Sequence, residues 1–206
     1  EELHLELEVI SQEPRAFIIP NFLSDFECDS IVKMGQPQLH RSLVGDGGSA
    51  SAISSTRSSR NTWVNRRKSE VTETLTLRTA DLLRIDEKLL NMNENAEELQ
   101  VLHYAVGQKY DPHHDWAAAE NANQRFITIL FYLNNMKHEN AGGETAFPKA
   151  AGGRGVKVHP GKGSAVLFYS MLPDGNADDL SLHEATPVRD GEKWLANYWI
   201  WDPKRS

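Results

Sequence analysis

The sequence predicts a mainly β protein, either a β-sandwich or a jelly roll, with helices in its N-terminal part packed against one sheet. Helical signals are confined to the part of the 206-residue chain before about residue 97. Short β-type runs follow, and glycine- and proline-containing turns separate them. Helices first and many strands afterwards favour a sheet sandwich with helices covering one outer face.

The N-terminal part predicts a strand, two helices and a short third helix. Residues 14–20 form a short apolar stretch that ends in Pro-Asn. Ser24 and Glu27 have the spacing of a capping box and begin a helix, and Ser69 begins a second helix with apolar residues on one side. Residues 87–92 predict another short helix.

The remainder of the chain predicts strands joined by turns. The β-type runs are residues 99–104, 126–133, 155–158, 165–169 and 194–201. Asp190-Gly191 has the composition of a two-residue hairpin turn and lies between strand-like segments. We therefore expect one domain over residues 1–206, with helical support over about 1–97 and a β-sandwich or jelly-roll core over about 98–206.

Composition narrows the function classes. With 39% hydrophobic and 25% charged residues, the chain has the composition of a protein that buries an ordinary core. Its formal net charge of −7 argues against a nucleic-acid partner. A single cysteine, Cys28, excludes an internal disulfide and a cysteine-rich metal centre. No apolar run approaches the ~20 residues needed to span a bilayer, although a signal peptide or membrane anchor ahead of Glu1 is compatible with the sequence.

A His-x-Asp motif at His113 and Asp115 is the first candidate for chemistry. Residues two apart on a strand face the same side, so both side chains reach one metal ion while His114 points away. His183 supplies a second imidazole. Two imidazoles and one carboxylate suit Fe(II) and leave positions for a bidentate cosubstrate and dioxygen.

Lys193 follows His183 across the predicted Asp190-Gly191 hairpin. A two-residue turn there pairs Lys193 near Val188, roughly 16 Å along the strand from His183. From that position, a flexible lysine side chain that extends toward the metal can form an ion pair with the distal carboxylate of a metal-chelated dicarboxylic acid.

Ordered motifs along nearly the whole chain carry a family resemblance. They are Pro14-Arg15-Ala16-Phe17, Asn21-Phe22-Leu23-Ser24, Arg57-Ser58-Ser59, Thr62-Trp63, Leu102-His103-Tyr104, Gly107-Gln108-Lys109-Tyr110-Asp111-Pro112-His113-His114-Asp115, Gln124-Arg125, Tyr132-Leu133-Asn134, Gly142-Gly143-Glu144-Thr145-Ala146-Phe147-Pro148, Ser181-Leu182-His183 and Gly191-Glu192-Lys193-Trp194. With these, the sequence resembles the catalytic domain of prolyl 4-hydroxylases of the plant and algal type, which are Fe(II)- and 2-oxoglutarate-dependent dioxygenases.

The resemblance implies a double-stranded β-helix, a cupin-like jelly roll, that hydroxylates peptidyl proline at C4 and releases succinate and CO2. It implies Fe(II) ligands at His113, Asp115 and His183, with ascorbate as the reductant. Lys193 would pair with the distal carboxylate of 2-oxoglutarate. Tyr104 and Thr145 would assist in binding this cosubstrate.

For the peptide substrate, the resemblance points to Tyr110, Arg125 and Trp199. Aromatic faces suit a proline-rich or collagen-like peptide in the polyproline II conformation, and arginine donates to its unpaired carbonyl groups. The chain departs from the family at Trp201, where a histidine is frequent, at Thr186-Pro187, where Cys-Pro is frequent, and at His114, where an aromatic residue is frequent.

Several alternatives stay open at this point. A 2-oxoglutarate oxygenase of this kind can act on another side chain, such as lysine. Two histidines and a carboxylate also suit a zinc hydrolase, and a non-catalytic jelly roll would bind proline-rich peptide through Tyr110, Trp116 and Trp199.

Three further expectations concern loops, assembly and location. Residues 45–56, rich in glycine and serine, and residues 171–180 are candidate lids that become ordered when peptide binds. We expect a monomer. The family resemblance suggests the lumen of the endoplasmic reticulum or Golgi, with a cytoplasmic location as the alternative.

Overall fold

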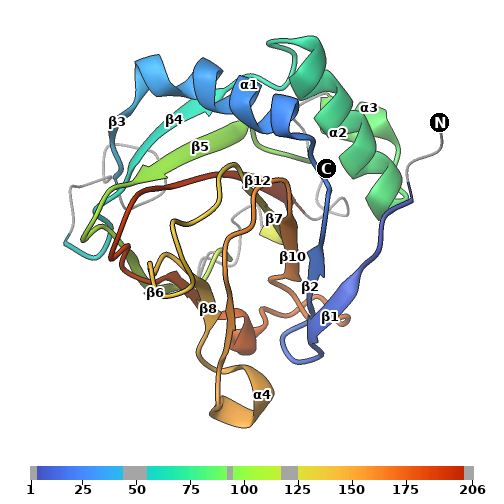
Figure 1. Cartoon of the computed structure of the whole chain (residues 1–206). Coiled ribbons are helices and arrows are strands. Elements are labelled where there is room, and N and C mark those ends of the chain that lie inside the picture. The colour runs from blue at the N-terminus through green and yellow to red at the C-terminus, as the bar shows by residue number, and fades with distance from the viewer. Residues whose placement is uncertain (1–3, 44–54, 92–94, 117–124, 202–206) are drawn as a thin grey trace.

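Two antiparallel sheets form the structure, a computed structural model that describes residues 4–43, 55–91, 95–116 and 125–201 (Figure 1). The larger sheet has the strand order β1 (Glu8–Ser11), β2 (Ala16–Ile19), β10 (Ala165–Tyr169), β7 (Arg125–Tyr132), β12 (Lys193–Trp201), β5 (Leu99–Tyr104), β4 (Arg60–Val64) and β3 (His40–Arg41). The smaller sheet has the order β6 (Tyr110–His113), β11 (His183–Ala185), β8 (Thr145–Phe147) and β9 (Val156–Val158). The predicted fold class, mainly β with a jelly-roll core and N-terminal helices, is confirmed.

The helices cover one face of the larger sheet, as Figure 1 shows for α1 (Asp25–Gly35) and α2 (Glu70–Leu83). Both begin where the sequence predicts. The Ser24 side chain caps α1 in a complete capping box with Glu27, and Ser69 caps α2 with Thr72 as its reciprocal partner. The short third helix, α3, spans Glu87–Asn91. None of the described helices has the length and hydropathy to cross a membrane.

Side chains of the central strands alternate between two hydrophobic cores. On β7, Ile127, Ile129 and Phe131 pack in the core beneath the helices. Leu130 and Tyr132 belong to a second core, between the two sheets, which also contains Phe147 of β8. One face of β7 and its neighbouring strands is therefore directed toward the smaller sheet. Polar residues on this face can form a site between the two sheets.

The N-terminal part contains more strands than predicted, because β1, β3 and β4 add to the one strand expected over residues 14–20. These strands extend the larger sheet at its edges. The burial of β4 does not alternate, and its sequence RNTWV is largely polar, so it lacks the period-2 signal of a strand. A short helix after residue 97, α4 (Ala150–Gly153), was also not expected.

The predicted hairpin at Asp190-Gly191 is wrong. The strand before this turn, β11, belongs to the smaller sheet, whereas β12 belongs to the larger one. Lys193 is in register with Tyr104 of β5 and not near Val188, which instead forms an isolated bridge with Gly142. A two-residue turn signal does not distinguish a hairpin from a corner where the chain changes sheets.

Of the two candidate lids, the structure describes the second in full and the first only at its C-terminal end. Residues 45–54 of the first lie outside the described residues. The second begins with a bridge between Met171 and Ala177 and ends in a short 3-10 helix, Asp179–Ser181. This loop leads directly into β11. Its ordering on peptide binding stays a prediction.

Gly142 is required by a close backbone approach at the corner before β8. It has a φ of 76°, and a Cβ there would lie 2.1 Å from the Pro187 carbonyl oxygen. Because that contact is with backbone, no side-chain movement relieves it. Gly152 also has a positive φ, 66°, but a Cβ there meets nothing within 4 Å.

This contrast predicts unequal costs for two glycine substitutions. Gly152→Ala should cost roughly 1–2 kcal/mol, the strain of the left-handed conformation alone. Gly142→Ala should cost at least ~2 kcal/mol more, because the clash adds to that strain. Denaturant unfolding of the two variants and the parent chain measures the difference. Equal destabilisation by the two substitutions would contradict the packing described at this corner.

Candidate metal and cosubstrate site

Two histidines far apart in sequence meet because of the register of two short strands. His113 is the last residue of β6 and His183 the first of β11, and the two are direct partners in the antiparallel pairing. Their ring centroids lie 4.3 Å apart. A cross-strand pair of this kind places both side chains on the same face of the sheet.

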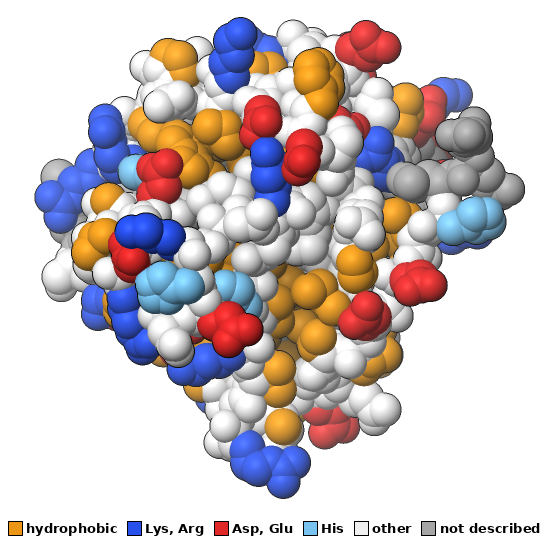
Figure 2. All heavy atoms as spheres, in the orientation of Figure 1, with side chains coloured by type: hydrophobic (Ala, Val, Ile, Leu, Met, Phe, Trp, Pro, Cys, Tyr) orange, Lys and Arg blue, Asp and Glu red, His pale blue; other side chains and the backbone are white. Residues whose placement is uncertain are grey.

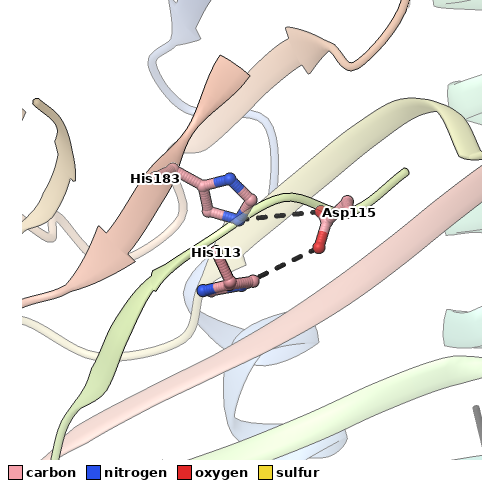
Figure 3. A group of neighbouring side chains, drawn as sticks. All are labelled: His113, Asp115 and His183. Atoms are coloured by element: carbon pink, nitrogen blue, oxygen red, sulfur yellow. Dashed lines mark ion pairs between the residues drawn. The ribbon is translucent and has the colours of Figure 1, made fainter. Parts of the chain in front are cut away.

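Asp115 completes a cluster of three metal-ligating side chains (Figure 3). Asp115 Oδ1 lies 3.8 Å from His113 Nε2, and Asp115 Oδ2 lies 3.7 Å from His183 Nε2. One ligand atom of each residue falls within 4.8 Å of the others. The sequence predicts that Asp115 lies on the same strand as His113. In the structure it lies in the bend that follows β6. His114 turns away, and its Nε2 lies 3.1 Å from the Asp179 carbonyl oxygen.

Backbone hydrogen bonds fix both imidazole rings. His113 Nδ1 lies 2.8 Å from the Asp111 carbonyl oxygen, and His183 Nδ1 lies 3.0 Å from that of Ser181. A carbonyl oxygen accepts only, so each Nδ1 donates its hydrogen. This hydrogen bond turns Nε2 of each ring toward the cluster, the orientation that a metal ligand requires.

The surroundings of His113 and Asp115 shift the pKa values of both side chains downward. Burial, and then the neighbouring His183 imidazole, lower the pKa of His113 well below its usual value. Burial by itself raises the pKa of the Asp115 carboxyl, but the His183 and His113 imidazoles, together with Arg125, lower it below its ordinary range. A neutral His113 beside an ionised Asp115 is suited to a divalent metal.

Lys193 lies buried at the start of β12. Its side chain is 1% exposed, and Nζ forms no hydrogen bond within the described part of the chain. Burial lowers the pKa of Lys193 from 10.5 to about 7, opposed only by the Glu144 carboxylate. Buried polar atoms are normally paired, so this ammonium group fits a ligand that brings its own carboxylate.

Aromatic and hydroxyl groups surround Lys193. Its Nζ lies 5.7 Å from the centroid of the Tyr104 ring and 5.5 Å from that of Tyr132. The Tyr132 hydroxyl donates to Thr145 Oγ1 at 2.7 Å. The structure thus brings Tyr104, Thr145 and Lys193 to one region, as predicted residues of a cosubstrate pocket.

Sequence reasoning missed Tyr132 and Thr128, although a signal for both existed. They stand four residues apart on β7 and so face the same side of the strand. Thr128 Oγ1 donates to Asp115 Oδ2 at 2.6 Å. Once one position on a strand is known to face the site, every second residue from it is expected to face the site as well.

The three residues predicted to contact peptide lie beside the metal-ligating cluster. The Tyr110 ring stacks on His113 with centroids 3.6 Å apart. Arg125 forms a two-pronged ion pair with Glu97, at 2.6 and 3.0 Å, and its Cζ lies 3.8 Å above the Trp199 ring. Trp199 is 4% exposed, and its Nε1 donates to Asp115 Oδ2 at 2.9 Å.

Residues 99–201, from β5 to β12, match the model of the 2OG-Fe(II) oxygenase superfamily. The chain belongs to this superfamily. It is also 39% identical over 214 residues to probable prolyl 4-hydroxylase 8 of Arabidopsis thaliana, covering 94% of this chain and 71% of that protein. Prolyl 4-hydroxylase 5 of the same plant is 39% identical over 94% of this chain and 70% of its own length.

A solved structure also supports the assignment of this chain to the prolyl hydroxylases. The viral collagen prolyl hydroxylase of Paramecium bursaria Chlorella virus-1, in its 2OG complex, superposes with a TM-score of 0.70 at 29% sequence identity. The match covers 90% of this chain and 94% of that one. The chain is thus a 2-oxoglutarate-dependent dioxygenase of the prolyl 4-hydroxylase family, with Fe(II) and 2-oxoglutarate as its cofactor and cosubstrate. Ascorbate is the reductant typical of that family.

Removing the buried cation at Lys193 should stabilise the protein without its cosubstrate. The unfolded chain binds the Lys193 proton up to about pH 10.5, the folded chain only up to about pH 7. The parent therefore gains stability as pH rises between these values, and the cost of the buried charge is full below pH 7. Lys193→Met should raise the melting temperature at pH 6, by roughly 2–4 °C for each kcal/mol gained, and the gain should shrink by pH 9.5.

Lys157→Met is the matched control, because Lys157 is exposed on β9. Its melting temperature should follow that of the parent at both pH values. A Lys193→Met protein that melts below the parent at pH 6 would show that the lysine has a stabilising partner.

Proposed function

We propose that this dioxygenase hydroxylates C4 of a proline residue in a peptide substrate, consuming O2 and 2-oxoglutarate and releasing succinate and CO2. The observation that carries the proposal is the unpartnered Lys193 ammonium in the same site as the His113, Asp115 and His183 cluster. A metal-binding triad alone suits several chemistries. A buried cation with no partner within the described residues adds the requirement for an acidic cosubstrate.

The donor set fits Fe(II), and we assign its binding to His113 Nε2, His183 Nε2 and a carboxylate oxygen of Asp115. Bound Fe(II) with 2-oxoglutarate supplies the oxidising power that inserts one oxygen atom of O2 into a C–H bond. Three protein ligands would leave coordination positions of the ion available for the cosubstrate and dioxygen.

The other residues of the pocket bind and orient 2-oxoglutarate in this proposal. Lys193 pairs with its distal carboxylate, and Thr145 donates to it. The Thr145 hydroxyl is free to donate because it already accepts from Tyr132. Tyr104 and Tyr132 enclose the ammonium group with aromatic surface, which excludes water and strengthens the ion pair.

Tyr110 and Arg125 remain our proposed contacts for a proline-rich or collagen-like peptide, whereas Trp199, predicted as a third contact, is 4% exposed and donates to Asp115 instead. Tyr110 offers a half-buried aromatic face beside His113. The Arg125 side chain is 30% exposed, so part of its guanidinium can reach a peptide carbonyl. We also keep the proposals of a monomer, of a location in the secretory lumen with the cytoplasm as the alternative, and of loops that order on peptide binding.

Charge and family membership weigh on the alternatives. On the face seen in Figure 2, Lys and Arg side chains are interspersed with Asp and Glu, and the net charge of −7 does not favour nucleic acid. Membership of the oxygenase superfamily disfavours the zinc hydrolase and the non-catalytic binding module. Hydroxylation of another side chain, such as lysine, is the alternative that the experiment below must test.

The direct experiment incubates the protein with Fe(II), ascorbate, 2-oxoglutarate and a panel of proline-rich, collagen-like and lysine-containing peptides. We expect succinate release coupled to a mass gain of one oxygen atom on proline. His113→Ala should abolish turnover. Lys193→Ala should raise the KM for 2-oxoglutarate by roughly 30-fold or more, as for loss of one partner of a buried charge pair, whereas Lys157→Ala should not. Oxygen located on lysine, or peptide hydrolysis supported by zinc without succinate, would refute the assignment.

Cosubstrate binding should also take up a proton above neutral pH. The pKa of Lys193, lowered by burial to about 7, leaves the amine mostly neutral at pH 8, and a bound carboxylate raises that pKa again. Titration calorimetry of 2-oxoglutarate into the Mn(II)-loaded protein, in two buffers of different ionisation enthalpy, should detect uptake approaching one proton at pH 8. At pH 6 the uptake should be close to zero. Equal uptake at both pH values would exclude Lys193 as the carboxylate partner.

A further inference from the structure

Asp115 is held at one oxygen by two donors from the opposite sheet. Oδ2 accepts from Thr128 Oγ1 at 2.6 Å and from Trp199 Nε1 at 2.9 Å. Thr128 of β7 and Trp199 of β12 are direct register partners in the larger sheet. Both side chains are buried, at 0% and 4% exposure. Oδ1 accepts no hydrogen bond from any residue that the structure describes.

We propose that Trp199 is a positioning residue of the metal site, which acts with Thr128 to keep Asp115 a ligand through Oδ1 alone. The proposal rests on the Fe(II) site of the proposed function. It gives Trp199 a role other than the peptide contact predicted from the sequence. The indole N–H is already used by Asp115, and almost no ring surface is exposed for a peptide.

The chemical reason lies in how a carboxylate binds a metal. An unrestrained carboxylate can bind through one oxygen or through both. Binding through both would occupy a coordination position that the cosubstrate and dioxygen need. Two hydrogen bonds to Oδ2 use its lone pairs and hold the plane of the carboxylate, so Oδ1 is the oxygen left for the metal.

Trp199 is itself fixed from outside the metal site. The Arg125 guanidinium lies 3.8 Å above its ring, within the range of a cation–π contact. Both prongs of Arg125 are held by Glu97, and the Trp201 indole donates to the same carboxylate at 3.0 Å. The chain of contacts from Glu97 to Asp115 therefore fixes the indole in the orientation that aims its N–H at Oδ2.

The test measures Co(II) affinity and the d–d absorption spectrum of the Co(II) protein, without substrate or turnover. Trp199→Phe keeps an aromatic ring but removes the N–H, and Thr128→Val removes the hydroxyl at nearly constant volume. Each should weaken Co(II) binding by ~10–100-fold, the usual effect of losing a partner of a metal ligand. Each should also change the spectrum, because Asp115 gains freedom to bind through both oxygens.

Two control variants separate this role from general packing. Thr128→Ser keeps the donor and should retain Co(II) affinity within about twofold of the parent. Trp194→Phe makes the same change on β12 but on the face that packs beneath the helices, and it too should retain affinity. Thermal melting of the metal-free proteins identifies any variant that fails to fold, in which case the other donor variant decides.

The outcomes distinguish this proposal from the proposed function. Co(II) affinity within twofold of the parent in both Trp199→Phe and Thr128→Val would overturn the positioning role, whatever their activity. A raised KM for peptide at unchanged Co(II) affinity would overturn it too, and would assign Trp199 to the substrate. A parent protein that binds Co(II) as described but hydroxylates no proline peptide would refute the proposed function and leave the positioning role standing.

Discussion

The site depends on two cross-strand pairs that face each other from different sheets. His113 and His183 are register partners in the smaller sheet, and Thr128 and Trp199 are register partners in the larger one. Asp115 lies between the pairs, where its oxygens face the two imidazoles and Oδ2 accepts both donors. A slip of one residue in either pairing would turn the side chain on the slipped strand to the opposite face of its sheet. The hydrophobic core between the sheets, which fixes their separation, therefore also fixes the geometry of the metal ligands.

The alternation of side chains along β12 explains why the metal and cosubstrate regions lie on the same face of the larger sheet. Lys193 and Trp199 are six positions apart on β12 and face the same side, toward the smaller sheet. Trp194 and Tyr198 face the other side and pack beneath the helices. The strand thus carries Lys193, the proposed cosubstrate residue, at one end and a contact to Asp115 near the other. The residues on the opposite face of β12 pack against the helices and fix the position of the strand. A rigid strand suits a site that must hold several groups in fixed relative positions.

The sequence predicted the fold class and the candidate residues better than it predicted their connections. Capping boxes at Ser24 and Ser69 located the starts of two helices, because capping depends on local side-chain chemistry. The strands of residues 99–104 and 165–169 had clear boundaries for a similar reason, since both carry continuous β-forming segments. The short strand β11 is too brief to show a period, and the chain's change of sheet after it depends on long-range packing. The expected pairing of Lys193 with Val188 failed on that point, although the structure does bring Lys193 beside Tyr104, the other strand residue predicted to bind the cosubstrate.

Contacts that cross between the sheets were not predictable for the same reason. No spacing in the sequence links Asp115 with Trp199, and the indole hydrogen bond exists only because two sheets pack face to face. The same packing leaves Lys193 without a partner among the residues that the structure describes, so its charged form is destabilising in the core. A core selected for stability alone would replace that lysine with an apolar residue of similar size. In the proposed function, the fold is less stable in the free state because it retains this lysine, and binding of the 2-oxoglutarate carboxylate recovers that stability. The proposal therefore gives the affinity for the cosubstrate and the lower stability of the free protein one physical origin.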